Sequence, residues 1–105
     1  MENIVVRMDR FNDIPNRRTR IVKKAATLMA GICFDQPFSE GNKETALDAT
    51  IGYLNNNGFD LKDKSLKEKK EIYGLLVKTV FKFPGDKTIF HEVEGYLDKN
   101  VVSLT

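Results

Sequence analysis

Residues 36–46 read QPFSEGNKETA and separate two segments of helical pattern. Pro37 is expected to end the first helix, because the residue before a proline avoids helical backbone angles. Gly41 lets the chain turn tightly, and without a Cβ it lets a ligand approach the backbone. The first amide groups of the next helix have no internal acceptors and carry partial positive charge. The stretch therefore has the character of an anion site suited to phosphate.

The two helices around this stretch follow from the spacing of apolar residues. The first is predicted over residues 17–34, and the second over residues 42–57, where Asn57-Gly58 is a good helix stop. Ala26 and Ala30 widen the apolar surface of the first helix with small side chains. The inward residues are predicted to be Ile21, Ala25, Leu28 and Ile32 in the first helix, and Ala46, Leu47, Thr50, Ile51 and Leu54 in the second.

Two more helices are predicted towards the C-terminus. Residues 65–68 match a capping box and start a helix that reaches about Phe83. After a turn at residues 84–85, Asp86 or Thr88 caps the last helix. The inward residues are predicted to be Tyr73, Leu76, Val77 and Val80 in the third helix, and Ile89, Phe90, Val93 and Leu97 in the last.

The N-terminal segment allows two structures. Ile4, Met8 and Phe11 fall at helical spacing, whereas residues 4–6 would also suit a strand. Residues 12–16 then form a turn. The sequence thus predicts a small all-α domain, with a short N-terminal hairpin or flap as an open alternative.

Length and composition indicate an ordinary globular protein. A chain of 105 residues makes one domain, 1–105, and 41% hydrophobic and 30% charged residues are typical of such domains. No apolar run approaches about 18 residues, and charges interrupt the N-terminal apolar run, so we expect neither a membrane helix nor a signal peptide. The single Cys33 cannot form an internal disulfide and is expected to be a buried filler. These features predict a cytoplasmic location.

The net charge of +2 does not by itself indicate a nucleic-acid partner. Basic residues are nevertheless concentrated in residues 7–24, where they outnumber the two acidic ones. This stretch is either a basic patch for an anionic partner or a solvated helix start and loop, and the second interpretation is favoured.

Residues 36–46 resemble the signature loop of the Fic/Doc (Fido) superfamily, which reads His-x-Phe-x-Asp/Glu-Gly-Asn-x-Arg-Thr. The resemblance runs from near Arg17 to Leu61 and ends on Tyr53-Leu54 and Asn57-Gly58. It implies a variable N-terminal segment or flap over 1–16, a signature helix-loop-helix over 17–61 and two closing helices over 62–105. The expected fold is a small Fic/Doc-like helical domain.

The resemblance also implies roles for residues of the loop. By analogy Phe38 anchors the loop, Glu40 holds Mg²⁺, and the nucleotide phosphates are bound by Gly41, Asn42, Lys43 and Thr45. Lys43 is similar to the lysine of the death-on-curing (Doc) toxins. Those toxins transfer the γ-phosphate of a nucleoside triphosphate to translation elongation factor Tu and are held inactive by an antitoxin. The resemblance therefore implies a nucleoside triphosphate, Mg²⁺ and a protein partner.

Two positions depart from the family pattern. Gln36 stands at the position of the catalytic histidine, a general base that typically supplies ~10²–10⁴-fold in rate, and glutamine cannot accept the proton. Glu44 replaces an arginine that binds phosphate, and like charges ~4 Å apart at an effective dielectric of ~20 repel by about 4 kcal/mol. A Mg²⁺ shared by Glu40 and Glu44 could compensate. His91 is expected to be a packed or surface residue rather than a replacement base.

Three functions remain open. The first is a Fic/Doc-like protein with a degenerate, catalytically silent loop that binds a protein partner or an anion. The second is an atypical phosphotransferase or nucleotidyltransferase that uses Gln36, Glu40, Asn42 and Lys43. The third is a nucleic-acid-associated helical protein, which the small net charge makes the weakest. The sequence does not fix the oligomeric state.

Overall fold

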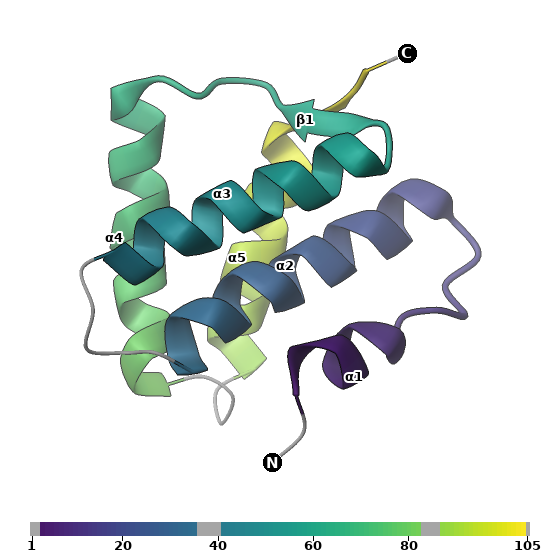
Figure 1. The fold of residues 1–105 in the computed structure, drawn as a ribbon, viewed down its shortest axis with the longest axis horizontal. Coiled ribbons are helices and arrows are strands. Elements are labelled where there is room, and N and C mark those ends of the chain that lie inside the picture. Colours follow the sequence, from purple (N-terminus) through teal and green to yellow (C-terminus); the bar gives the residue numbers. More distant parts are fainter. Residues whose placement is uncertain (1–2, 36–40, 83–86, 105) are drawn as a thin grey trace.

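The computed structural model describes residues 3–35, 41–82 and 87–104. They form five helices and two short strands, so the all-α fold is confirmed (Figure 1). In chain order these are α1 (Ile4–Asp9), α2 (Arg17–Asp35), α3 (Gly41–Asn56), β1 (Phe59–Leu61), α4 (Leu66–Lys82), α5 (Lys87–Asn100) and β2 (Val101–Ser103). The bounds of α2, α3 and α4 agree with the prediction to within one residue.

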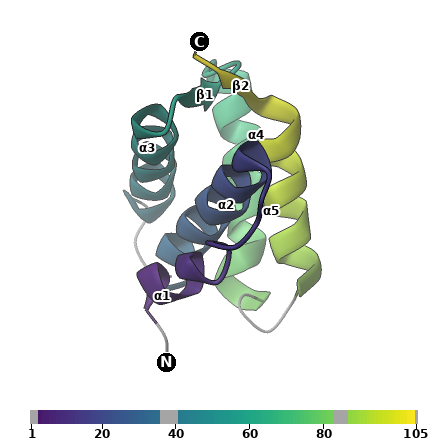
Figure 2. The ribbon, with the colours of Figure 1, turned by 90° about the vertical axis from the view of Figure 1, so that its right-hand side faces the viewer.

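Helix α2 is the centre of the molecule. It contacts α1, α3, α4 and α5, and Figure 2 shows α3 on one side of it and α5 on the other. Ala25, Ala26 and Ala30 are fully buried in α2, and their small side chains let the neighbouring helices approach closely. A helix surrounded in this way is buried on more than one face. Its buried residues are therefore not confined to one stripe along the helix.

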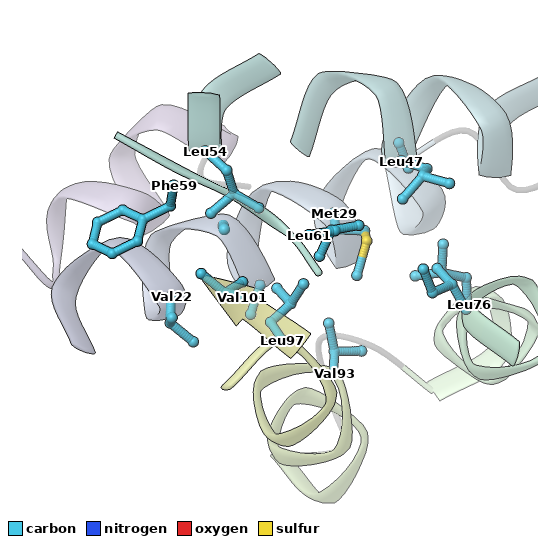
Figure 3. Packing of buried hydrophobic residues seen from close by; sticks show 14 of the residues in the cluster. Val22, Met29, Leu47, Leu54, Phe59, Leu61, Leu76, Val93, Leu97 and Val101 are labelled. Atoms are coloured by element: carbon cyan, nitrogen blue, oxygen red, sulfur yellow. The ribbon is translucent and has the colours of Figure 1, made fainter. Parts of the chain in front are cut away.

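The hydrophobic core draws on all of the long helices (Figure 3). Met29, Leu54, Leu76 and Leu97 come from α2, α3, α4 and α5, and none of them is exposed to solvent. Burying a side chain of this size contributes about 1.5–3 kcal/mol each to folding. The core therefore holds the C-terminal helices to the segment that contains the predicted loop.

The buried face of α2 differs from the prediction. Ile21 and Ala25 are buried as expected, but Leu28 and Ile32 are only half-buried. Met29 lies in the core instead. Helix α2 is packed by four other helices, so the buried residues do not follow the single predicted stripe.

The N-terminal segment is a helix, so the alternative of an N-terminal hairpin is wrong. Asn3 caps α1 by accepting a 2.8 Å hydrogen bond from the amide of Val6. Helix α1 lies against α2 at Gly31, where a Cβ would stand 3.0 Å from Cγ1 of Ile4. Phe11, just after α1, stacks on Phe90 of α5 with ring centroids 6.1 Å apart.

The two strands form a small antiparallel sheet that the sequence did not predict. Phe59 pairs with Ser103, and Leu61 with Val101. Gly58 precedes β1 with φ +85°, a left-handed conformation that glycine adopts at little cost, which confirms the predicted helix stop. The pairing brings the C-terminal end of α5 beside the end of α3.

Helices α4 and α5 are close to their predicted positions. The amide of Glu68 donates to the hydroxyl of Ser65 at 3.4 Å, in the direction expected for a capping box. Val77, predicted to face inward, is exposed, whereas Ile72 is buried. The predicted turn at 84–85, the Asp86 cap, and the side chains of Val80, Thr88 and Ile89 lie outside the described residues.

No helix in the described part of the chain combines the length and the apolar character needed to cross a membrane.

Candidate functional site

The predicted anion site lies where α2 ends and α3 begins, beside α4 (Figure 1). Gln36, Phe38 and Glu40 lie outside the described residues, as does the side chain of Asn42. Helix α3 begins at Gly41, one residue before the predicted start. The first turn of α3, residues 41–45, is therefore the part of the site that the structure describes.

The side chains in the first turn of α3 differ in their exposure to solvent. Lys43 is half-buried, Glu44 and Thr45 are exposed, and Ala46 is fully buried. Glu44 is the acidic residue of this turn, where a carboxylate interacts favourably with the helix dipole. Lys43, Glu44 and Thr45 thus stand around the start of a helix whose first amides lack internal acceptors.

Lys43 exerts its charge on Cys33 at the end of α2. Cys33 is buried, and this burial raises the pKa of its thiol to about 11, although the nearby Lys43 ammonium works in the opposite direction. The thiol is therefore protonated at neutral pH, and a protonated thiol is a poor nucleophile. The expectation that Cys33 is a buried filler is confirmed.

The acidic residues of α3 act on Tyr73 of α4. The pKa of Tyr73 is raised, first by burial and then by the carboxylates of Glu44 and Asp48. The surface where α3 starts against α4 therefore carries negative charge beside the positive charge of Lys43. This proximity was not predictable from the sequence, because it depends on how α3 and α4 both pack against α2.

The chemistry of this first turn matches only part of what a nucleotide would need. The helix amides and Lys43 fit a phosphate group, but the Glu44 carboxylate repels it where the family pattern has an arginine. Across the described residues, no cluster of three or more His, Cys, Asp or Glu could hold a metal ion, and Glu40 lies outside those residues. A compensating Mg²⁺ at Glu40 and Glu44 stays a prediction.

His91 is a surface residue, as expected. Its side chain is 69% exposed on α5, with Nδ1 3.6 Å from Oε1 of Glu94, and its ring meets the edge of Phe90. Helix α5 lies on the other side of α2 from α3 (Figure 2). Gln36 lies outside the described residues, so the expectation that His91 does not replace a general base stays a prediction.

Basic residues of the 7–24 stretch bind other parts of the chain. Lys23 of α2 forms an ion pair with Glu94 of α5 at 2.6 Å, and the side chain of Arg7 in α1 is buried. Further contacts join Arg17 to the carbonyl of Asn57, Arg18 to Asp98, Arg20 to the carbonyl of Ile14, and Lys24 to the side chain of Asn12. These side chains tie elements of the fold together, a role that neither earlier interpretation of the stretch included.

Comparison with known proteins identifies a family. A family model described as the Fic/DOC family matches residues 1–54. The match covers α1, α2 and most of α3, and so includes the signature loop. Neither a curated protein nor a solved structure matches the chain.

Proposed function

The chain belongs to the Fic/DOC family, and on this premise we propose that it binds a protein partner or an anion without catalysing group transfer. The observation that carries the proposal is the exposed Glu44 carboxylate in the first turn of α3, at the position of the family's phosphate-binding arginine. A carboxylate there opposes the approach of a triphosphate. The replacement of the general base by Gln36 points in the same direction.

The type of partner in this proposal follows from Lys43. The run Gly-Asn-Lys, with Lys43 half-buried in the first turn of α3, is similar to the Doc subclass. We therefore propose an antitoxin-like protein, or a translation factor, as the partner. The ammonium of Lys43 would favour an anionic group of that partner at the helix start.

The proposal is tested by restoring the family residues. Thermal unfolding is measured with and without ATP and Mg²⁺ for the wild-type chain and for Gln36→His combined with Glu44→Arg. We expect no nucleotide-dependent stabilisation of the wild type and a clear increase in melting temperature for the double variant. Glu71→Arg, an equivalent charge change at an exposed position of α4, should give no increase. Transfer of a phosphoryl or nucleotidyl group by the wild-type chain would contradict the proposal, and stabilisation of the wild-type chain by ATP would show that Glu44 does not exclude a triphosphate.

A second candidate is an active phosphotransferase or nucleotidyltransferase. It is favoured by two features that suit a phosphate group. The first amides of α3 have no acceptor within the helix, and the charge of Lys43 lies nearby. In that case Gln36, Glu40, Asn42 and Lys43 would orient the nucleotide, the metal and the target hydroxyl. Incubation with ATP labelled at the α- or γ-phosphate distinguishes the reactions. Label that reaches a protein, and that disappears in Asn42→Ala, would establish this candidate.

The nucleic-acid alternative has the least support. Arg17, Arg18, Arg20 and Lys23 already make contacts within the chain. Phosphate binding by these side chains would compete with those contacts. Binding to nucleic acid that weakens steeply with salt would be the result that favours it.

A further inference from the structure

A groove of about 640 Å³ lies between α4 and α5, outside the segment matched by the family model. Residues of both helices line it, among them Glu71, Gly74, Gly95 and Tyr96. It belongs to the closing helices rather than to the signature loop. Its role is therefore a separate question from nucleotide binding.

The floor of the groove contains two glycines inside helices. Gly74 lies within α4 and Gly95 within α5, and no atom stands within 4 Å of the place where a Cβ would lie on either. Glycine weakens a helix interior relative to alanine. The packing of this chain does not require that loss, since an alanine would fit at both positions. The bare backbone does, however, let the backbone of another molecule come close.

The described lining of the groove is predominantly acidic. Glu68, Glu71 and Glu92 line it together with one basic residue, Lys99, although the chain as a whole has a net charge of +2. The hydroxyl of Tyr96 donates a 2.6 Å hydrogen bond to Oε2 of Glu68, which fixes that carboxylate at the wall. The groove therefore combines negative charge, the aromatic ring of Tyr96, and two glycines that let another backbone come close.

We propose that this groove binds a lysine- or arginine-bearing helix of a partner protein. The basic side chains would pair with the glutamates of the rim and lie over the ring of Tyr96. The helix backbone would rest on Gly74 and Gly95, as amphipathic helices do in grooves between helices. A nucleic acid is disfavoured by its charge. A second copy of the chain is an alternative occupant that the test below distinguishes.

The probe for this proposal is a synthetic amphipathic helix of lysine, alanine and leucine with lysines at i and i+4, and its twin has glutamate in place of every lysine. Both are titrated into the full chain labelled with ¹⁵N, and fluorescence anisotropy of the labelled peptides gives the affinities. The lysine peptide should bind at least about tenfold more tightly than the glutamate twin and lose affinity with added salt. The backbone signals that move should be those of Gly74, Gly95, Tyr96 and their neighbours.

Two variants locate the binding site. Gly95→Met fills the groove and Glu71→Lys reverses the charge at its rim, and each should weaken the lysine peptide by about tenfold or more. Gly52→Met is the matched control, because Gly52 lies in α3 with no atom within 4 Å of its Cβ position. It should bind the peptide like the wild type. Circular dichroism verifies that all three variants are folded.

Several results would overturn the proposal. These are equal binding of the two peptides, unchanged affinity in Gly95→Met, or shifts that map to the start of α3. A dimer of the chain that Gly95→Met abolishes would identify a second copy as the occupant. None of these measurements contains ATP, so their outcome is independent of the test of the proposed function.

Discussion

The guanidinium of Arg18 in α2 binds Asp98 in α5, eighty positions later in the chain, with Nη1 2.5 Å from the carboxylate. Nη2 donates to the carbonyls of Asp98 and Val101 at 2.7 and 3.0 Å. Asp98 lies in the last turn of α5, where the last carbonyls of a helix lack internal donors and a cation is favourable, and Val101 follows as the first residue of β2. A residue of the family-matched segment thus caps a helix that lies outside it.

Arg18→Ala should destabilise the chain more than Asp98→Ala. Loss of the arginine leaves two carbonyl groups without this donor, and hydrogen bonds with a charged partner contribute about 1.5–3 kcal/mol each when shielded. The ion pair itself is 39% and 61% exposed at its two side chains, so Asp98→Ala should cost less than about 1 kcal/mol. Urea unfolding of both variants measures the difference. Equal losses would show that the carbonyl contacts contribute little.

Gly31→Ala should loosen α1 from α2. A Cβ at Gly31 would stand 3.0 Å from Cγ1 of Ile4 and 3.2 Å from Nη2 of Arg7, so these side chains of α1 must move to make room for it. Overpacking of this kind costs about 1–3 kcal/mol. Gly52→Ala in α3 is the control, since nothing lies near its Cβ position, and it should raise stability by up to about 1 kcal/mol. Thermal unfolding that moves both variants the same way would refute the contact.

Cys33 should react slowly and should make stability depend on alkaline pH. Burial raises the pKa of its thiol from 9.0 to about 11. The folded state therefore holds the proton more tightly, and the associated stability is complete below pH 9 and is lost as the pH rises through 11. Between these values the unfolding free energy of Cys33→Ala should fall less steeply than that of the wild type. Thiol titration at pH 8 should be slow without denaturant, and a fast reaction would contradict the burial.

The ionised carboxylate of Asp60 should stabilise the fold, and this stabilisation should be lost in strong acid. Its pKa is lowered from 3.8, first by the hydrogen bond from Lys64 and also by the amide of Leu61. The contribution is present above pH 3.8 and is lost as the pH falls through the lowered value. In Lys64→Ala the pKa of Asp60 should rise towards 3.8, which carboxyl ¹³C titration by NMR measures. An unchanged titration would show that the 2.7 Å contact with Lys64 is absent in solution.

The helices were largely predictable because their signals are local. Asn57-Gly58 and the Ser65 capping box act within a few residues, and the helices next to them have the predicted bounds to within one residue. The choice between helix and strand for residues 4–9 was not local. The apolar spacing suited both structures, and in the helix Ile4 packs against Gly31 of α2. The pairing of β1 with β2 joins residues far apart in the chain, so neither segment of three residues carries enough pattern alone.

The candidate site was predictable in its residue types but not in its surroundings. The sequence placed Lys43 and Glu44 at a helix start, and the structure confirms that placement. It did not indicate that Lys43 would act on Cys33, or that Glu44 and Asp48 would act on Tyr73. Those relationships come from α3 and α4 both packing on α2.

The sequence by itself determined the helical class of this protein and the likeness of residues 36–46 to the Fic/Doc family, because caps, turns and apolar periods act over a few residues. Only the tertiary structure decided that α2 is buried from several sides, that Arg18 caps α5, and that Gly74 and Gly95 line one groove. The physical reason is that these features depend on contacts between residues far apart in the sequence. Those contacts are set by how the helices pack around α2.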